Sequence, residues 1–352
     1  MDILNYLQEE YPDVYERTRY NIIEISDSLV QLQRQKLKTH PCVKVTHKSI
    51  FHWRTKELAP CFFVAMEVIV SMLRNEMTRC KVLTQSQDNF AHDVIRYDLR
   101  TLQPYQGVVT IDSEGDFDIL YTPVTDPLIA DFLDLRHRLN HPLPVNKLLR
   151  ASHTLRNMYL SLPFSPNLSM EEFIPTRLLS LLRTLRHHFP RHRLLLSDFS
   201  SLPDTIAGVN APVVQTRFRN TTVPCSTMLV RQGYFDIFFP TNFECLRDMY
   251  EFTVSRISDP STNLPPMRSI PLANNSTPVS LGPDFFFSQS ERNRRRPLDG
   301  VNSASGLPVG ERKSSVFTHS EFMQTYAELG RTRLINGENP MLDFYTNVKF
   351  LF

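Results

Sequence analysis

The sequence predicts an α/β fold built around a mostly parallel, twisted sheet with helices on both faces. Three features early in the chain support this prediction: an order of strand, helix, strand and strand; strands that are apolar almost throughout; and apolar residues at helical spacing between the first two strands. Strands are expected at 20–26, 43–46 and 62–66, and a helix at 28–37. Strands of continuous apolar character are typically buried on both faces of a parallel sheet.

The middle of the chain has a different pattern. Residues 105–123 alternate polar and apolar side chains around Glu114-Gly115-Asp116, which predicts a hairpin. Helical patterns cover 126–160 and 176–189, the second one lying between Pro175 and Pro190. An apolar strand, 191–200, then contains Asp198 near its end.

Further elements are expected towards the C-terminus. Residues 235–252 predict a strand, a turn at Pro240 and a helix, and 255–315 are rich in Pro, Ser, Asn and Arg. Such a composition buries too little apolar area to offset the entropy of ordering, so this segment is expected to be a disordered loop. A helix from Phe317 to about Gly330 and a terminal strand within 342–352 complete the prediction.

Composition limits the class of protein. Of 352 residues, 41% are hydrophobic and 22% charged, and the net charge is +2, which describes a globular chain without a general attraction to nucleic acid or anionic membranes. No apolar run approaches the ~18 residues that span a bilayer. Early acidic residues in 2–16 argue against a secretory signal or a mitochondrial presequence at this N-terminus.

Clusters that could bind metal or nucleic acid have simpler explanations. Five scattered cysteines without metal-ligand spacing are expected to be reduced structural thiols, and no metal site is predicted. The basic run 292–296 fits a solvated loop, with nucleic-acid or partner contact as the alternative. His187, His188 and His192 among arginines fit a solvated helix end, with metal or phosphate binding as the alternative.

Carboxylates follow several of the predicted strands. Glu24 ends the first, Glu67 ends the strand at 62–66, and Asp198 ends the strand at 191–200. In doubly wound sheets, ligands bind beyond the carboxyl ends of the strands, and an acidic residue there accepts hydrogen bonds from ribose hydroxyls. Asp88 and Asn89, further along the chain, are candidates for the same kind of site as Glu67. The alternatives are an exposed helix-capping carboxylate for Glu24, a rim charge for Glu67, and a helix N-cap for Asp88 and Asn89. A glycine-rich turn that would hold a nucleotide is absent upstream of Glu24.

Four segments together resemble a known family. They are "YNIIEISDSLVQLQRQKL", "FFVAMEVI" with "DNFAHD", "RLLLSDFS", and "VPCSTMLVRQGYFDIFFPTNFECLRDMYEF". In this order they resemble the MidA-like family of mitochondrial S-adenosylmethionine-dependent methyltransferases, which includes a protein-arginine methyltransferase of respiratory complex I assembly. The resemblance implies a class I methyltransferase-like, Rossmann-like fold, lacking here its first strand and glycine-rich loop.

The resemblance also implies roles for particular residues. Glu24, followed by Ile25 and Ser26, would bind the methyl donor, and Glu67, Asp88 and Asn89 would form the acidic motif beside donor and acceptor. Asp198 matches an Asp-aromatic-Gly motif, but Ser200 stands in place of the glycine. The implied cofactor is S-adenosyl-L-methionine, and the implied partner is a protein substrate of complex I in the mitochondrion, with no nucleic acid and no membrane span.

In the family the strand-end Glu and the following Asp-Asn lie close together. Residues 70–87 separate them here and are expected to be an insertion, as a retained intron would produce; a genuine surface loop is the alternative. Residues 2–10 resemble the end of the helix that follows the family's glycine-rich loop, so the chain is expected to be N-terminally truncated.

The expected organisation has five parts. It comprises a partial cofactor-binding α/β region (1–104), a hairpin and helical insertion (105–175), the rest of the α/β domain (176–254), a disordered loop (255–315), and a C-terminal helix and strand (316–352). The functional alternative to a methyltransferase is a non-catalytic assembly protein that retains the fold.

Overall fold

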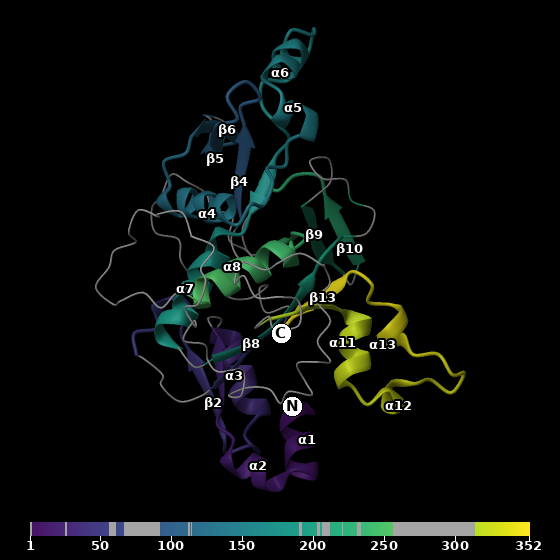
Figure 1. Cartoon of the computed structure of the whole chain (residues 1–352). Helices are drawn as coiled ribbons and strands as arrows, with labels where there is room; N and C mark the ends of the chain where they lie inside the picture. Colours follow the sequence, from purple (N-terminus) through teal and green to yellow (C-terminus); the bar gives the residue numbers. More distant parts are fainter. Residues whose placement is uncertain are drawn as a thin grey trace, which may run out of the picture.

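The computed structural model describes residues 2–24, 27–55, 61–66, 92–111, 113, 115–189, 192–202, 205, 212–219, 221–230, 234–255 and 314–352. Four sheets and the helices around them make up this part of the chain (Figure 1). The expected insertion at 70–87 and most of the expected loop at 255–315 lie outside the described residues. Ser314 and Ser315, at the end of that loop, are buried, and Ser314 donates to Glu251 Oε1 from both its main-chain N (3.2 Å) and its hydroxyl (2.6 Å).

The N-terminal region forms a parallel strand pair with a crossover helix. Helices α1 and α2 precede strand β1, helix α3 connects it to β2, and a short 3₁₀ helix, η1, follows; their bounds are Asp2–Glu10, Pro12–Arg17, Tyr20–Glu24, Asp27–Lys36, Val43–His47 and Ile50–His52. β1 and β2 are parallel, with Tyr20 opposite Val43 and Glu24 opposite His47. A parallel pair needs such a crossover, usually a helix, because a tight turn cannot return the chain to the same end.

A second sheet has the strand order β12-β13-β8-β3, with bounds Val316–Thr318, Val348–Leu351, His192–Phe199 and Cys61–Met66. β3 and β8 are parallel, whereas β13 is antiparallel to both β8 and β12. In β8, buried and half-buried residues alternate over the first four positions, and the next three residues, up to Asp198, are all buried. This pattern fits a strand covered on both faces.

The third sheet, β6-β5-β4-β7, is antiparallel throughout, and its strands are Phe117–Pro123, Pro104–Ile111, Asp93–Tyr97 and Glu172–Ile174. The predicted hairpin is confirmed as β5 and β6, which pair from Tyr105–Pro123 to Ile111–Phe117. Gly115 at its tip has φ 92°, a conformation that a residue without a Cβ adopts at little cost.

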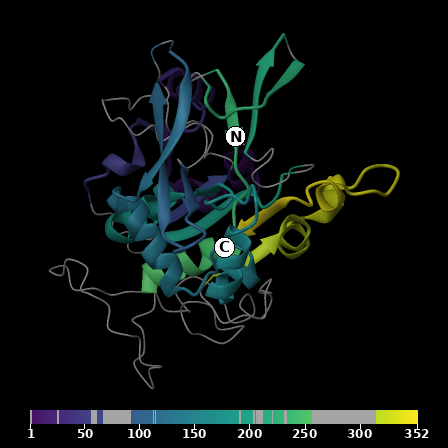
Figure 2. The ribbon, with the colours of Figure 1, turned by 90° about the horizontal axis from the view of Figure 1, so that it is seen from above.

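A fourth sheet, β10-β9-β11, is formed by Thr221–Cys225, Val213–Phe218 and Asp236–Phe238. Its two strand pairs are antiparallel. Figure 2 shows the β9–β10 hairpin extending away from the other sheets.

The helices between these sheets carry the core. They are α4, α5, α6, α7 and α8, with bounds Pro127–Arg138, Lys147–Ala151, His153–Leu160, Thr176–His188 and Phe243–Ser255. α7 begins directly after Pro175, as predicted, and buries a stripe of leucines that includes Leu178, Leu182 and Leu185. These leucines join residues of α4, α8, β4 and β8 in the largest apolar cluster, so the core connects the second and third sheets.

The C-terminal region corrects one expectation. The helix expected from Phe317 to about Gly330 is divided into α11 (His319–Tyr326) and α12 (Leu329–Thr332), and α13 (Pro340–Asp343) follows. α11 starts with a capping box between Thr318 and Glu321, and it ends at Ala327, whose ψ of 151° is extended. These helices lie together at one side in both views (Figures 1 and 2).

The expected mostly parallel sheet is only partly observed. Among the described strands two pairs are parallel, β1–β2 and β3–β8, and seven are antiparallel. The antiparallel excess comes from the β4–β7 sheet, the β9–β11 sheet and the C-terminal strands. The mixed α/β class is therefore correct, whereas the description as one parallel sheet does not follow from the described pairings.

Candidate functional site

The carboxyl ends of β3 and β8 lie next to each other in one sheet. Their parallel register pairs Met66 with Ser197, so β3 ends beside the residue that precedes Asp198. Asp198 is 6% exposed although it carries a carboxylate. A buried carboxylate at the ends of parallel strands is the arrangement that ligand sites of α/β sheets use.

Hydrogen bonds fix the position of Asp198. The Thr241 hydroxyl donates to Asp198 Oδ2 at 2.7 Å, and the main-chain N of Phe199 donates to Oδ1 at 2.7 Å. The main-chain N of Thr241 also donates to the carbonyl of Phe199, at 2.8 Å. The segment that leads into α8 is thereby attached to the end of β8, and Asn242 caps this helix by accepting from Cys245 N at 3.0 Å.

Glu24 occupies the carboxyl end of β1, as predicted. Its side chain is 5% exposed, which is inconsistent with the exposed capping carboxylate considered above. The carbonyl of Glu24 accepts from Lys48 N at 3.0 Å, and Asp27 starts α3 three residues later. A buried carboxylate at this strand end fits the acid that accepts ribose hydroxyls in nucleotide-binding α/β folds.

The structure brings together only part of the predicted site. Glu67, Asp88, Asn89, Ile25 and Ser26 lie outside the described residues, so their proximity is not observed. β3 ends at Met66, directly before Glu67 in the sequence, and the described chain resumes at His92, three residues after Asn89. Glu24 belongs to the β1–β2 sheet, and no described strand pairs this sheet with the one that carries Asp198.

Two residues of the polar set 88–93 have positions that sequence reasoning did not assign. The His92 ring stacks on Phe239 with centroids 4.1 Å apart and an interplanar angle of 14°. Asp93, the first residue of β4, accepts a hydrogen bond from the Thr176 hydroxyl at the start of α7. Burial raises the pKa of Asp93 to about 6, and the nearby charge of Asp126 adds to this effect, while the Thr176 hydrogen bond opposes it.

A small, partly open pocket lies beside this stack. Side chains of the β4–β7 sheet and of the segments before and after β11 line it, including His92, Val94, Gly107, Ile119, Met228 and Phe239. Gly107 forms part of the pocket floor, where a side chain would be crowded: a Cβ there would lie 3.1 Å from Ile119 Cγ2 and 3.3 Å from Val94 Cβ. Phe239 is two residues from Thr241, which hydrogen-bonds Asp198 and the carbonyl of Phe199, so this short segment links the pocket lining to the end of β8.

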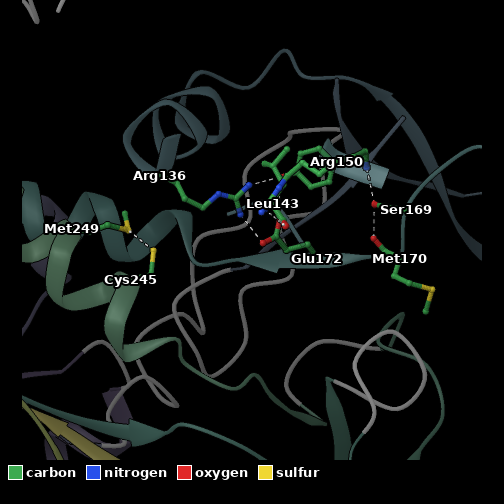
Figure 3. Close-up of polar contacts among 9 residues, drawn as sticks. Arg136, Leu143, Arg150, Ser169, Met170, Glu172, Cys245 and Met249 are labelled. Carbon is green, nitrogen blue, oxygen red and sulfur yellow. Dashed lines mark hydrogen bonds and ion pairs between the residues drawn. The ribbon is translucent and has the colours of Figure 1, made fainter. Parts of the chain in front are cut away.

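A buried ion pair joins α4 to β7 on the other side of this region. Arg136 Nη1 lies 2.6 Å from Glu172 Oε1, and Tyr97 hydrogen-bonds both residues (3.0 Å to Glu172 Oε2). Figure 3 shows Arg136 pointing toward Glu172, while Cys245 faces Met249 (3.7 Å). Burial raises the pKa of the Cys245 thiol to about 12, so this cysteine stays protonated and is not a nucleophile.

Within the described part of the chain, no group of three or more His, Cys, Asp or Glu side chains is arranged to hold a metal ion. The helices in the same part are all too short or too polar to cross a bilayer.

Residues 1–258 match a family model described as "Putative S-adenosyl-L-methionine-dependent methyltransferase". The chain belongs to this methyltransferase family. The cofactor of the family is S-adenosyl-L-methionine, as the sequence resemblance implied, and the matched range includes the positions of Glu24 and Asp198.

Known proteins show more distant similarity. The chain is 22% identical over 228 residues to the "Protein arginine methyltransferase NDUFAF7 homolog, mitochondrial" of Schizosaccharomyces pombe, covering 61% of this chain and 44% of that protein. Two Burkholderia thailandensis structures are 12% identical and cover 67% of this chain. One is an uncharacterised protein (TM-score 0.40, 50% of its length), and the other is a methyltransferase candidate bound to S-adenosyl-homocysteine (0.39, 48%). The chain thus spans about half the length of these proteins.

Proposed function

We propose that the chain is an S-adenosylmethionine-dependent protein arginine methyltransferase. The observation that carries the proposal is the family match over residues 1–258, which supports methyl transfer. Arginine as the acceptor is supported by the name of the S. pombe relative. When bound, S-adenosylmethionine supplies an electrophilic methyl group on its sulfonium.

In this proposal Glu24 accepts hydrogen bonds from the ribose hydroxyls of the donor, and Ile25 and Ser26 continue the donor site. Support comes from the burial of Glu24 at the carboxyl end of a parallel strand. Because bulk water has little access to a carboxylate buried at this position, water competes less with a bound sugar for its hydrogen bonds.

Glu67, Asp88 and Asn89 are proposed to hold the acceptor. Methyl transfer to a guanidinium nitrogen requires mainly orientation of the acceptor along the line of the breaking bond. Carboxylates are suited to this role because they accept paired hydrogen bonds from the planar, permanently charged guanidinium and so fix its orientation. Support comes from the sequence: Glu67 directly follows Met66, the last residue of β3, which pairs with Ser197 of β8.

Calorimetric titration with S-adenosyl-homocysteine tests the donor site. Glu24→Gln is expected to weaken binding by at least about tenfold, because a charge-assisted hydrogen bond contributes roughly 1.5–3 kcal/mol. The control, Asp27→Asn, changes an exposed carboxylate three residues away and is expected to leave the affinity within about twofold of the wild type. Equal effects of the two variants would contradict the ribose role.

The acceptor assignment is tested separately with tritiated S-adenosylmethionine and protein from the source cells, followed by amino-acid analysis for methylarginine. Glu67→Gln is expected to depress turnover while the affinity for S-adenosyl-homocysteine stays close to that of the wild type. A parallel loss of binding and turnover would show that Glu67 does not act on the acceptor. Label on a residue other than arginine would disprove the acceptor class.

We also propose that the two sheets with parallel strands are parts of one Rossmann-like sheet. With β12-β13-β8-β3 on one side and β1-β2 on the other, this sheet would be mostly parallel, with β13 antiparallel. Hydrogen exchange tests this: slow exchange of the outward-facing amides of β1 and β3 is expected, and exchange as fast as in loops would refute it.

The mitochondrion and complex I assembly are proposed as the setting, supported only by the mitochondrial relative. Co-fractionation with a mitochondrial matrix marker is the expected result, and a purely cytosolic distribution would contradict it. The alternative is a non-catalytic assembly protein with the same fold. That alternative predicts no methyl transfer to any cellular protein and no binding of S-adenosyl-homocysteine.

A further inference from the structure

Helices α5 and α6 and the turn after them form a protruding tip with exposed apolar side chains. Figure 1 shows these helices at the end of the molecule most distant from the N-terminal region. The apolar tip consists of Leu148 on α5, Met158 on α6, and Leu162 and Phe164 in the turn, which are 67%, 64%, 55% and 103% exposed. Large apolar residues exposed together mark interaction surfaces, whereas single ones are common on any protein.

The turn holds Phe164 outward. Phe164 has φ 65°, which is unfavourable for a residue with a Cβ, so the surrounding structure maintains the conformation. On either side, the main-chain N of Leu162 donates to Tyr159 O (3.1 Å), and that of Ser165 donates to Leu162 O (3.3 Å). The main-chain N of Leu99 donates to Asn167 O (2.8 Å) and fastens the end of the turn to the β4 region. The exposure of the ring is therefore a property of an ordered turn.

The charge around the tip has one sign. The sequence has no Asp or Glu between Asp134 and Glu171, although the net charge of the whole chain is only +2. The tip itself carries Lys147, Arg150 and Arg156. Arg150 and Arg156 donate to main-chain carbonyls, which orients the guanidinium groups without neutralising their charge.

The acidic residues that flank this segment are already engaged. Asp134 Oδ2 lies 2.6 Å from Arg138 Nη2, and Glu171 Oε1 accepts from the Tyr121 hydroxyl at 2.5 Å. The tip thus combines outward apolar side chains with uncompensated basic ones. This is the combination that binds the headgroup region of anionic bilayers, where apolar side chains enter the interface and Lys or Arg stay at the phosphates.

We propose that the apolar tip docks on an anionic lipid surface. Leu148, Met158, Leu162 and Phe164 enter the interfacial layer, and exposed Lys147 binds the lipid phosphates, while the half-buried Arg150 and Arg156 add positive charge behind it. The surface is peripheral and does not require a membrane-spanning helix. It is independent of the proposed methyl transfer, because none of its residues lies at the strand ends that carry Glu24 and Asp198.

Vesicle sedimentation of the full chain tests the proposal. The probes are vesicles of phosphatidylcholine alone and of phosphatidylcholine mixed with phosphatidylserine. The tip variant is Phe164→Asn, which removes the ring and suits the positive φ, so that the turn remains foldable. The matched control is Ile335→Asn, at an equally exposed apolar residue (110%) between α12 and α13.

The wild type is expected to bind the anionic vesicles, less strongly at high salt, and to bind phosphatidylcholine vesicles weakly. Phe164→Asn is expected to lower the affinity about tenfold, as the loss of one buried aromatic side chain predicts, and Ile335→Asn is expected to have no effect. Lys147→Gln is expected to reduce binding to anionic vesicles about fivefold, from the loss of one cationic contact.

Three results would overturn the proposal: no sedimentation of the wild type with anionic vesicles, equal losses for Phe164→Asn and Ile335→Asn, or self-association without lipid that Phe164→Asn abolishes. The last result would assign the tip to an interface between two copies of the chain.

Discussion

The buried carboxyl of Asp93 makes stability depend on pH in a predictable direction. Its pKa of about 6 in the folded chain lies above the ordinary value of 3.8. The folded state therefore holds the proton more tightly than the unfolded state, and the free energy of unfolding decreases as pH rises from about 4 through 6. The two pKa values differ by about two units. Because each unit corresponds to 1.36 kcal/mol, the free energy of unfolding changes by about 3 kcal/mol in total.

Asp93→Asn removes this titration and keeps an oxygen that accepts from the Thr176 hydroxyl. The variant is expected to be more stable than the wild type by up to about 3 kcal/mol at pH of about 8, with roughly half of this difference developing above pH of about 5. Urea unfolding followed by circular dichroism at several pH values measures it.

Asp131→Asn is the control for this comparison. Asp131 forms a half-exposed pair with Arg183 (2.9 Å), so its substitution is expected to change stability by less than about 1 kcal/mol at every pH. A stability difference between Asp93→Asn and the wild type that does not vary with pH would refute the reasoning, because it would show that the carboxyl has the same pKa in both states.

Three other predictions follow from buried groups. Glu172→Ala leaves the buried guanidinium of Arg136 without its carboxylate and is expected to lower the free energy of unfolding in urea by about 3–5 kcal/mol. The control, Asp134→Ala, removes a more exposed pair and should lower it by less than about 1 kcal/mol. Similar losses for the two variants would contradict the role of burial. Cys245 should react with iodoacetamide far more slowly than half-buried Cys225 in the native chain, as mass spectrometry would show, and comparable rates would argue against its raised pKa. Gly107→Val should lower stability by about 1–3 kcal/mol through crowding at the pocket floor, and an unchanged melting temperature would show that the pocket walls yield.

Local patterns in the sequence predicted most elements correctly. The apolar run ending at Glu24, the leucine stripe between Pro175 and Pro190, and the turn at Gly115 each act over a few residues. The three-residue β7 and the β9–β10 hairpin were not predicted, because short or half-exposed strands lack a clear period. The resemblance to a methyltransferase family also rested on four short segments of the sequence, and the family match over residues 1–258 confirmed it.

Tertiary structure decided how these elements combine. β8 pairs with β3 on one side and with β13 on the other, across more than a hundred residues of chain in each direction. The Asp198–Thr241 hydrogen bond and the His92–Phe239 stack likewise join distant segments. The sequence by itself determined most of the strands and helices and placed Glu24 and Asp198 at strand ends, since propensity and periodicity are local. Register, burial and the resulting pKa of Asp93 depend on which distant surfaces pack together, and only the folded chain specifies that.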